Sequence, residues 1–165
     1  MKKWISLALL SSSLLLSGCQ SAYYGAMEKV GYHKRDIMVD RVQNAKESQQ
    51  EAQEQFSSAL EEMQALLAFD GGDLEDAYNK AKDEYESAQT AADEVTNRID
   101  KVEDVADALF AEWQDEITEI SKASLRRNST NKLNETKRAY SSLVKSMRRA
   151  EAKMPPILTA MKDNM

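Results

Sequence analysis

Apolar residues recur along most of this chain in alternating steps of three and four, the spacing of one face of a helix in a coiled coil. The pattern is most regular in the middle of the chain, at the positions Leu74, Tyr78, Ala81, Tyr85, Ala88, Ala92, Val95, Ile99, Val102, Ala106, Leu109 and Trp113. A helix over residues 73–120, rising 1.5 Å per residue, is roughly 70 Å long. The pattern therefore predicts a rod rather than a globule.

The same spacing predicts a helix before this segment and another after it. The apolar positions of a helix over residues 34–69 are Met38, Val42, Ala45, Ala52, Phe56, Ala59, Met63 and Leu66, with Gln49 filling one slot. Those of a helix over residues 131–154 are Leu133, Thr136, Tyr140, Leu143, Met147, Ala150 and Met154. A polar break at residues 121–131 is expected to precede the latter helix.

Two short motifs are expected to end helices. Asp70-Gly71-Gly72-Asp73 predicts a turn, because glycine accepts a left-handed backbone and Asp73 can cap the next helix. Pro155-Pro156 should kink or end the last long helix, since proline lacks the backbone donor. A short apolar segment, residues 157–165, follows; either it docks into the bundle or the sequence is a shortened form of a longer chain. The predicted fold is all-α, an elongated, antiparallel, coiled-coil-like three-helix bundle.

The composition agrees with this fold, and the charge divides the chain into an acidic and a basic part. Only five glycines and two prolines are present, as in proteins built of long helices. Residues 19–120 contain 9 Lys or Arg against 25 Asp or Glu, whereas residues 121–165 contain 11 against 3. We expect the basic third helix to pair with the acidic hairpin along its length, rather than to form a patch for nucleic acid or anionic lipid.

The N-terminus carries a bacterial lipoprotein signal. Two lysines precede an apolar run too short to span a bilayer, and the run ends in Leu16-Ser17-Gly18-Cys19, which contains the only cysteine. We predict cleavage between Gly18 and Cys19, with diacylglycerol and an N-acyl chain on Cys19 as the only covalent additions. The chain then divides into a signal peptide (1–18), a lipidated tether (19–33) and a helical coiled-coil domain (34–165).

Residues close to the predicted anchor suggest further membrane contacts. Tyrosines in the tether suit the membrane interface, where a ring can be half buried with its hydroxyl in water. The side chains of Lys29, Lys34 and Arg35 could contact anionic headgroups. Alternatively, they are surrounded by water at the start of a helix.

No arrangement of residues in the sequence indicates catalysis. The chain has a single histidine, His33, and its single cysteine is the predicted lipidation site; we find no Ser-His-Asp or Cys-His constellation in the sequence. Phosphate-binding glycine loops and zinc-ligand spacings are missing from the sequence as well. We therefore expect no enzyme activity, no metal and no cofactor.

Several segments, taken together with the lipidation motif, resemble an uncharacterised family of gammaproteobacterial lipoproteins, the domain of unknown function twenty-nine fifty-nine. They are His33-Lys34-Arg35-Asp36, Phe69-Asp70-Gly71-Gly72, Glu112-Trp113-Gln114-Asp115 and Ser124-Leu125-Arg126-Arg127. The resemblance covers essentially the whole mature chain and carries no activity. Members of the family extend further past the double proline, which favours a shortened form. Gln20 after the lipidated cysteine implies, by the sorting rule of Gram-negative lipoproteins, export to the outer membrane, with the periplasmic face as the default.

Two functions fit these features. The first is a lipid-anchored structural or protein-interaction rod that holds an unknown protein or the cell wall, alone or as a homo-oligomer. The second is a helical binding module with an apolar groove for a lipid or another hydrophobic ligand, suggested by Met154, Met161 and Met165.

Overall fold

The computed structural model describes residues 18–29, 31–68 and 70–165. These residues contain no strand, and they form five helices: α2 (Gly18–Lys29), α3 (Lys34–Leu67), α4 (Leu74–Glu119), α5 (Ala123–Glu151) and α6 (Met154–Asp163). The predicted all-α class is confirmed, and the three long helices are present. The count of three is corrected in two places, because the predicted tether contains α2 and the short C-terminal segment after the third long helix forms a helix of its own, α6.

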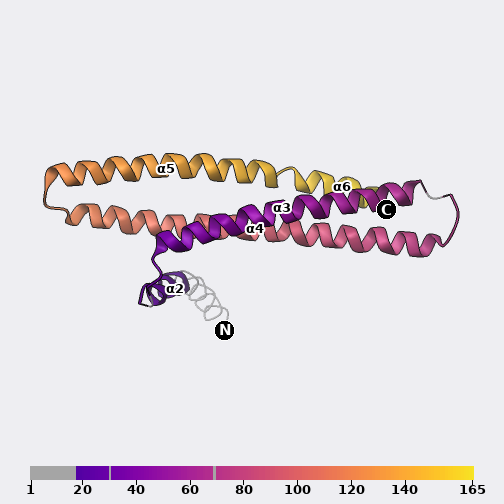
Figure 1. Ribbon diagram of the computed structural model, residues 1–165, viewed down its shortest axis with the longest axis horizontal. Helices are drawn as coiled ribbons and strands as arrows, with labels where there is room; N and C mark the ends of the chain where they lie inside the picture. The colour runs from indigo at the N-terminus through magenta and orange to yellow at the C-terminus, as the bar shows by residue number, and fades with distance from the viewer. Residues whose placement is uncertain (1–17, 30, 69) are drawn as a thin grey trace, which may run out of the picture.

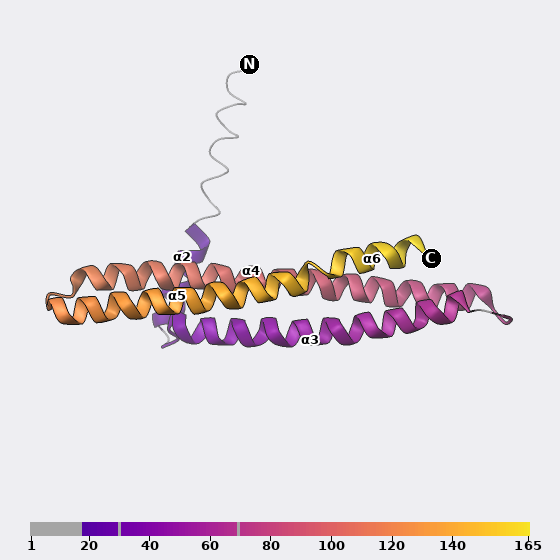
Figure 2. The same ribbon diagram turned by 90° about the horizontal axis from the view of Figure 1, so that it is seen from above.

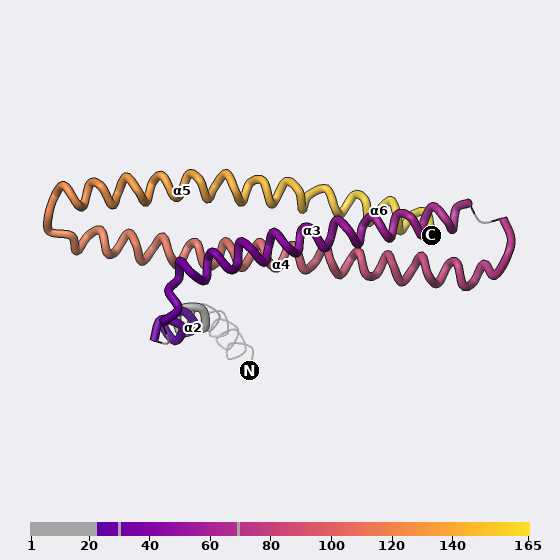
Figure 3. Tube along the Cα trace, viewed as in Figure 1, coloured from indigo at the N-terminus to yellow at the C-terminus, as the bar shows by residue number. Residues whose placement is uncertain are grey.

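The helices form an elongated rod around α4 (Figures 1 and 2). α3 runs antiparallel to α4 and joins it through a hairpin at one end of the rod. α5 returns from the opposite end, and α6 continues its course towards the hairpin (Figure 3). α2 lies beside the start of α3, part-way along the rod. Beyond this point α3 no longer accompanies α4, so the end of the rod near the α4–α5 turn consists of two helices.

Asp73 and the glycines before it shape the hairpin as the sequence predicted. The Asp73 carboxylate accepts hydrogen bonds from the backbone N–H groups of Glu75 at 3.0 Å and Asp76 at 3.3 Å, which caps α4. Gly72 has a φ of 127°, a conformation that side chains larger than hydrogen rarely adopt.

The polar stretch predicted as a break at residues 121–131 is largely helical, because α5 begins at Ala123. Most of its polar side chains are exposed, so they interrupt the apolar pattern without opposing a helix. The Arg126 side chain donates a hydrogen bond of 2.9 Å to the Ile120 carbonyl, and the Trp113 indole donates one of 2.9 Å to the Ser129 hydroxyl. These contacts join α5 to α4 over the segment that was expected to be a loop.

The double proline separates α5 from α6, as predicted. α5 ends at Glu151, and Pro155 and Pro156 occupy the first turn of α6, where missing N–H groups cost no intrahelical hydrogen bond. α6 packs against the bundle through Met161, which is only 2% exposed. The C-terminal segment thus docks into the bundle, while the shortened form of a longer chain stays a prediction.

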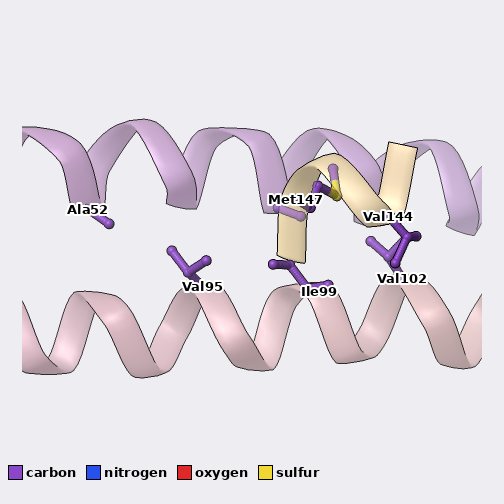
Figure 4. Packing of buried hydrophobic residues seen from close by; sticks show 7 residues of the cluster. Ala52, Val95, Ile99, Val102, Val144 and Met147 are labelled. Atoms are coloured by element: carbon purple, nitrogen blue, oxygen red, sulfur yellow. The ribbon is translucent and has the colours of Figure 1, made fainter. Parts of the chain in front are cut away.

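The core follows α4 because this helix packs against α3 on one side and against α5 and α6 on another. Figure 4 shows part of this core, where α3, α4 and α5 meet. One cluster consists of Ala45, Ala52, Val95, Ile99, Val102, Val144 and Met147. A second consists of Phe56, Ala59, Met63, Ala88, Ala92 and Met161. The buried alanines let neighbouring helices approach closely, whereas the larger side chains supply most of the buried apolar area.

The three helices do not pack equally tightly in pairs. α4 pairs extensively with α3 and also with α5 and α6, whereas the backbones of α3 and α5 come close at few points. The Gln49 side chain bridges this wider gap by donating a hydrogen bond of 3.2 Å to the Met147 carbonyl on α5. The polar residue in the predicted stripe of α3 thus contacts the third helix.

The burial pattern gives a direct test of the core. Val95 is 0% exposed whereas Val39 is 63% exposed, so the same truncation should have different costs at the two positions. Val95→Ala should lower the free energy of unfolding by about 2 kcal/mol through lost burial and a residual cavity. Val39→Ala should change it by less than about 0.5 kcal/mol. Urea denaturation followed by circular dichroism measures both, and equal midpoints for the two variants would contradict the assignment of the core.

Candidate functional site

The predicted anchor residues lie at the start of α2. The helix begins at Gly18, so Cys19 and Gln20 belong to its first turn. Residues 1–17 of the predicted signal peptide lie outside the described residues. Cleavage before Cys19, lipidation of Cys19 and sorting through Gln20 stay predictions.

α2 is attached to the rod by a small apolar cluster. Tyr24 is 6% exposed and packs with Ile37 of α3 and Val105 of α4. Burial raises the pKa of Tyr24 above its ordinary value, with a further contribution from the nearby charge of Asp104. The expectation that the tyrosines of this segment lie at a membrane interface is therefore wrong for Tyr24, whose ring is part of the protein core; Tyr23 is exposed.

An ion-pair cluster around Lys34 joins α2, α3 and α4. The Lys34 ammonium contacts the carboxylate of Glu28 on α2 and lies 3.2 Å from that of Glu112 on α4. Desolvation alone would lower the pKa of Lys34, but the hydrogen bonds to the two carboxylates outweigh it and raise the pKa. The hydrogen bond from Lys34 lowers the pKa of Glu28. This cluster fixes the start of α3 against α4.

The three predicted headgroup contacts differ in their surroundings. Lys34 is 13% exposed and already paired within the protein, whereas Lys29 and Arg35 are exposed. The headgroup role of all three stays a prediction, and the structure assigns Lys34 a further role in holding three helices together. His33 is exposed at the start of α3.

A second ion-pair cluster, around Arg148, joins α5 to α4. The Arg148 guanidinium contacts the carboxylates of Asp100 and Glu103 on α4 and lies 3.0 Å from that of Glu151 on its own helix. Glu151 also accepts a hydrogen bond of 2.7 Å from Thr96 of α4. Desolvation alone would lower the pKa of Arg148, but hydrogen bonds to these carboxylates raise it. A planar guanidinium that contacts several carboxylates favours one register of α5 on α4.

Tyr140 lies next to this cluster and experiences its negative charge. Burial, together with Glu103 and Asp107, raises the pKa of Tyr140 to about 12. The ring packs edge-on against Phe110 of α4, with ring centres 5.3 Å apart. This pair of aromatic rings therefore contributes to the packing of α5 against α4.

The charge pairing predicted along the whole third helix occurs at one place only. Of the eleven Lys and Arg residues in 121–165, Arg148 alone forms an ion pair with α3 or α4 within the described residues. The reason is geometric: the heptad pattern turns the apolar face of α5 towards α4, which leaves most cations on the outer faces. The acidic and basic surfaces consequently remain exposed on the rod.

An open groove of about 1130 Å³ lies between α3 and the α5–α6 segment, where the helices stand apart. Its apolar lining includes Phe56, Leu60, Met154 and Ile157. Of the three methionines that suggested a ligand groove, only Met154 lines it. Met161 is buried in the core beside Phe56. Sequence spacing could not reveal this groove, since it depends on how far α3 and α5 stand apart.

A second groove, of about 890 Å³, lies where α3 begins against the α4–α5 pair. It is lined by Val39, Leu109 and Trp113, among others. Among the residues that the structure describes, no group of three or more His, Cys, Asp or Glu is placed to hold a metal ion. None of the described helices is both long enough and apolar enough to cross a membrane.

Comparison with known proteins identifies a family but no activity. Residues 23–165 match a family model described as "Protein of unknown function (DUF2959)". No curated protein and no solved structure matches the chain.

The Arg148 cluster predicts different effects for two adjacent arginines. Arg148→Gln should lower the free energy of unfolding by about 1 kcal/mol, since it removes the contacts with α4. Arg149→Gln should change it by less than about 0.5 kcal/mol, because Arg149 is exposed on the outer face. Urea denaturation at low and high salt measures both, and the difference should shrink as salt screens the charges. A loss of unfolding free energy in Arg149→Gln as large as that in Arg148→Gln would count against the role of Arg148 in joining α5 to α4.

Proposed function

The chain belongs to the DUF2959 family of proteins of unknown function, and we propose that it acts as a lipid-anchored structural or protein-interaction rod. In this proposal Cys19 carries the lipid, Gln20 directs the protein to the outer membrane, and the rod lies on the periplasmic side. The partner is a protein or the cell wall, and the rod has no catalytic activity.

The observation that carries this proposal is the unbroken course of α4. It contains 46 residues, which corresponds to a length of about 70 Å. The helices packed along it bury its apolar face, and the cavities described above are open grooves rather than enclosed sites. Such a shape is suited to presenting surfaces at a distance from an attachment point.

The position of α2 determines how such an anchor would hold the rod. α2 contacts the rod where α3 begins, through Tyr24 and through the Lys34 cluster. A lipid on Cys19 would therefore attach the rod part-way along its side rather than at its end. From that point α3 extends 34 residues, or about 50 Å, towards the hairpin. The hairpin end is thus the part that reaches furthest from the anchor.

Exposed apolar side chains gather at this far end. Leu67 is 64% exposed at the end of α3, Leu74 is 58% exposed at the start of α4, and Tyr78 is 41% exposed one turn later. Isolated exposed leucines are common on protein surfaces, but several at the end of the longest arm favour a contact with a partner.

A second function, the binding of a lipid or another hydrophobic ligand, is favoured by the groove between α3 and α5–α6. Phe56, Leu60, Met154 and Ile157 form the apolar part of its lining, beside polar residues that include Lys46 and Lys153. Its volume of about 1130 Å³ is large enough for a lipid chain. A defined lipid retained by the purified protein, and lost in Ile157→Asp, would favour this function over the rod.

The anchor is tested by fractionating cells that have been fed labelled palmitate. The wild-type chain should become labelled and appear in outer-membrane fractions. Cys19→Ala should remain an unlabelled, uncleaved precursor, because no other thiol is present. Gln20→Asp should be labelled but move to inner-membrane fractions, and Gln20→Asn serves as the matched uncharged control. An unlabelled wild-type chain would contradict the lipid anchor, and unchanged fractionation of Gln20→Asp would contradict the sorting role.

The interaction role is tested by photocrosslinking in living cells. A photoreactive amino acid at Leu67 or Tyr78 should yield a discrete crosslinked species, either a protein or a cell-wall fragment. The same amino acid at Leu125, 53% exposed near the opposite end of the rod, is the control for non-specific capture. Failure to capture any partner at the hairpin end, with correctly localised protein, would be evidence against an interaction through this end.

A further inference from the structure

The outer surface of α5 carries a row of cations. Arg138, Lys145 and Arg149 recur at intervals of seven and four residues, which places them on one face of the helix. All three are exposed, as are Ser142 and Ala152 on the same face. In the part of the chain that the structure describes, none of the three cations forms an ion pair. We call these five residues the α5 outer face.

A shallow groove with the opposite charge runs between α3 and α4. Its volume is about 610 Å³, and its lining includes the carboxylates of Glu51, Asp83, Glu86 and Glu94 but no Lys or Arg. Lys82 and Arg98, outside the lining, pair with Glu86 and Glu94, whereas Glu51 and Asp83 form no ion pair within the described residues. Ser87 and Ala91 contribute small side chains to the same lining. We call this the α3–α4 groove.

We propose that the α5 outer face of one copy docks into the α3–α4 groove of a second copy of this chain. Opposite charges on the two surfaces favour this pairing. The small residues on both sides, Ser142 and Ala152 on one and Ser87 and Ala91 on the other, allow two helices to approach closely. The lengths also agree, because Arg138–Ala152 spans about 21 Å and Asp83–Glu94 about 17 Å along their helices.

A second copy accounts for both surfaces together. An anionic lipid surface would neutralise the α5 outer face but leave the α3–α4 groove without a partner. Within one copy, the cations of the α5 outer face form no ion pair with those residues of the acidic hairpin that the structure describes. Association between copies uses the cations of the α5 outer face and, in the groove, above all the exposed carboxylates of Glu51 and Asp83. It does not depend on the lipid anchor, so it can fail while the proposed rod function stands.

The contact joins two different surfaces, so each docked copy still offers one free surface of each kind. Such a heterologous contact continues into a ring or a filament instead of stopping at a symmetric dimer. Copies would therefore associate side by side into larger assemblies. The contact should weaken with salt, because both surfaces are exposed to solvent.

The test is sedimentation velocity of the full chain in a density-matched detergent, at low salt and over a range of concentrations. The face variant is Arg138→Gln, Lys145→Gln and Arg149→Gln; the groove variant is Glu51→Gln, Asp83→Asn and Glu86→Gln. The wild type should form assemblies that dissociate at about 0.5 M salt, where the screening length is only about 4 Å. Each variant alone should sediment as a monomer.

Mixing the two variants provides the sharpest readout. The face variant retains an intact groove and the groove variant retains an intact face, so an equal mixture should form heterodimers that cannot grow further. A control variant that removes three positive charges, as the face variant does, but at other positions is Lys46→Gln, Lys132→Gln and Lys162→Gln. This control should assemble like the wild type. Circular dichroism checks that all variants remain helical.

Three outcomes would overturn the proposal. The first is a wild-type chain that stays monomeric at low salt and high concentration. The second is a mixture of folded variants that fails to form heterodimers. The third is a face variant that assembles normally but loses binding to phosphatidylglycerol vesicles, since the α5 outer face would then serve a lipid surface instead of a second copy.

Discussion

Burial of the apolar surface of α4 is the interaction on which the rest of the structure depends. α3, α5 and α6 all pack against this helix, and Val95, Ile99 and Val102 at its centre are fully buried. In proteins most of the stability of a helix comes from the packing of its apolar face, so the persistence of α4 as a single element relies on neighbours along its sides. The elongated shape follows, because each neighbour covers only part of α4.

Charge has a more local role than the uneven distribution along the chain suggests. Two clusters, centred on Lys34 and Arg148, join helices that are distant in sequence and fix where α3 and α5 lie along α4. Elsewhere most cations of α5 face solvent, while some carboxylates of the hairpin pair with its own cations, as Glu62 does with Lys80 and Glu94 with Arg98. The apolar pattern therefore determines which faces pack, while a few ion pairs favour one register and the remaining charges are available for contacts outside the molecule.

The shape and the exposed surfaces together favour a role in holding molecules rather than transforming them. α2 joins the rod along its side, so an anchor at Cys19 would leave the hairpin end projecting furthest. The charged surfaces run lengthwise, where neighbouring rods could meet side by side. The grooves are open and lie between helices, and the larger one owes its existence to the gap between α3 and α5.

The sequence by itself determined the helical class, the long central helix, the Asp73 cap and the break at the double proline, because these features depend on local periodicity and backbone chemistry. It also located the candidate anchor, whose signal lies in consecutive residues. Only the tertiary structure decided that Tyr24 is buried, that Lys34 is paired, that among the described residues Arg148 forms the one ion-pair link from the basic helix to the hairpin, and that α5 begins early. These depend on the distances between helices and on which way each face turns, and residue spacing within one helix carries no information about either.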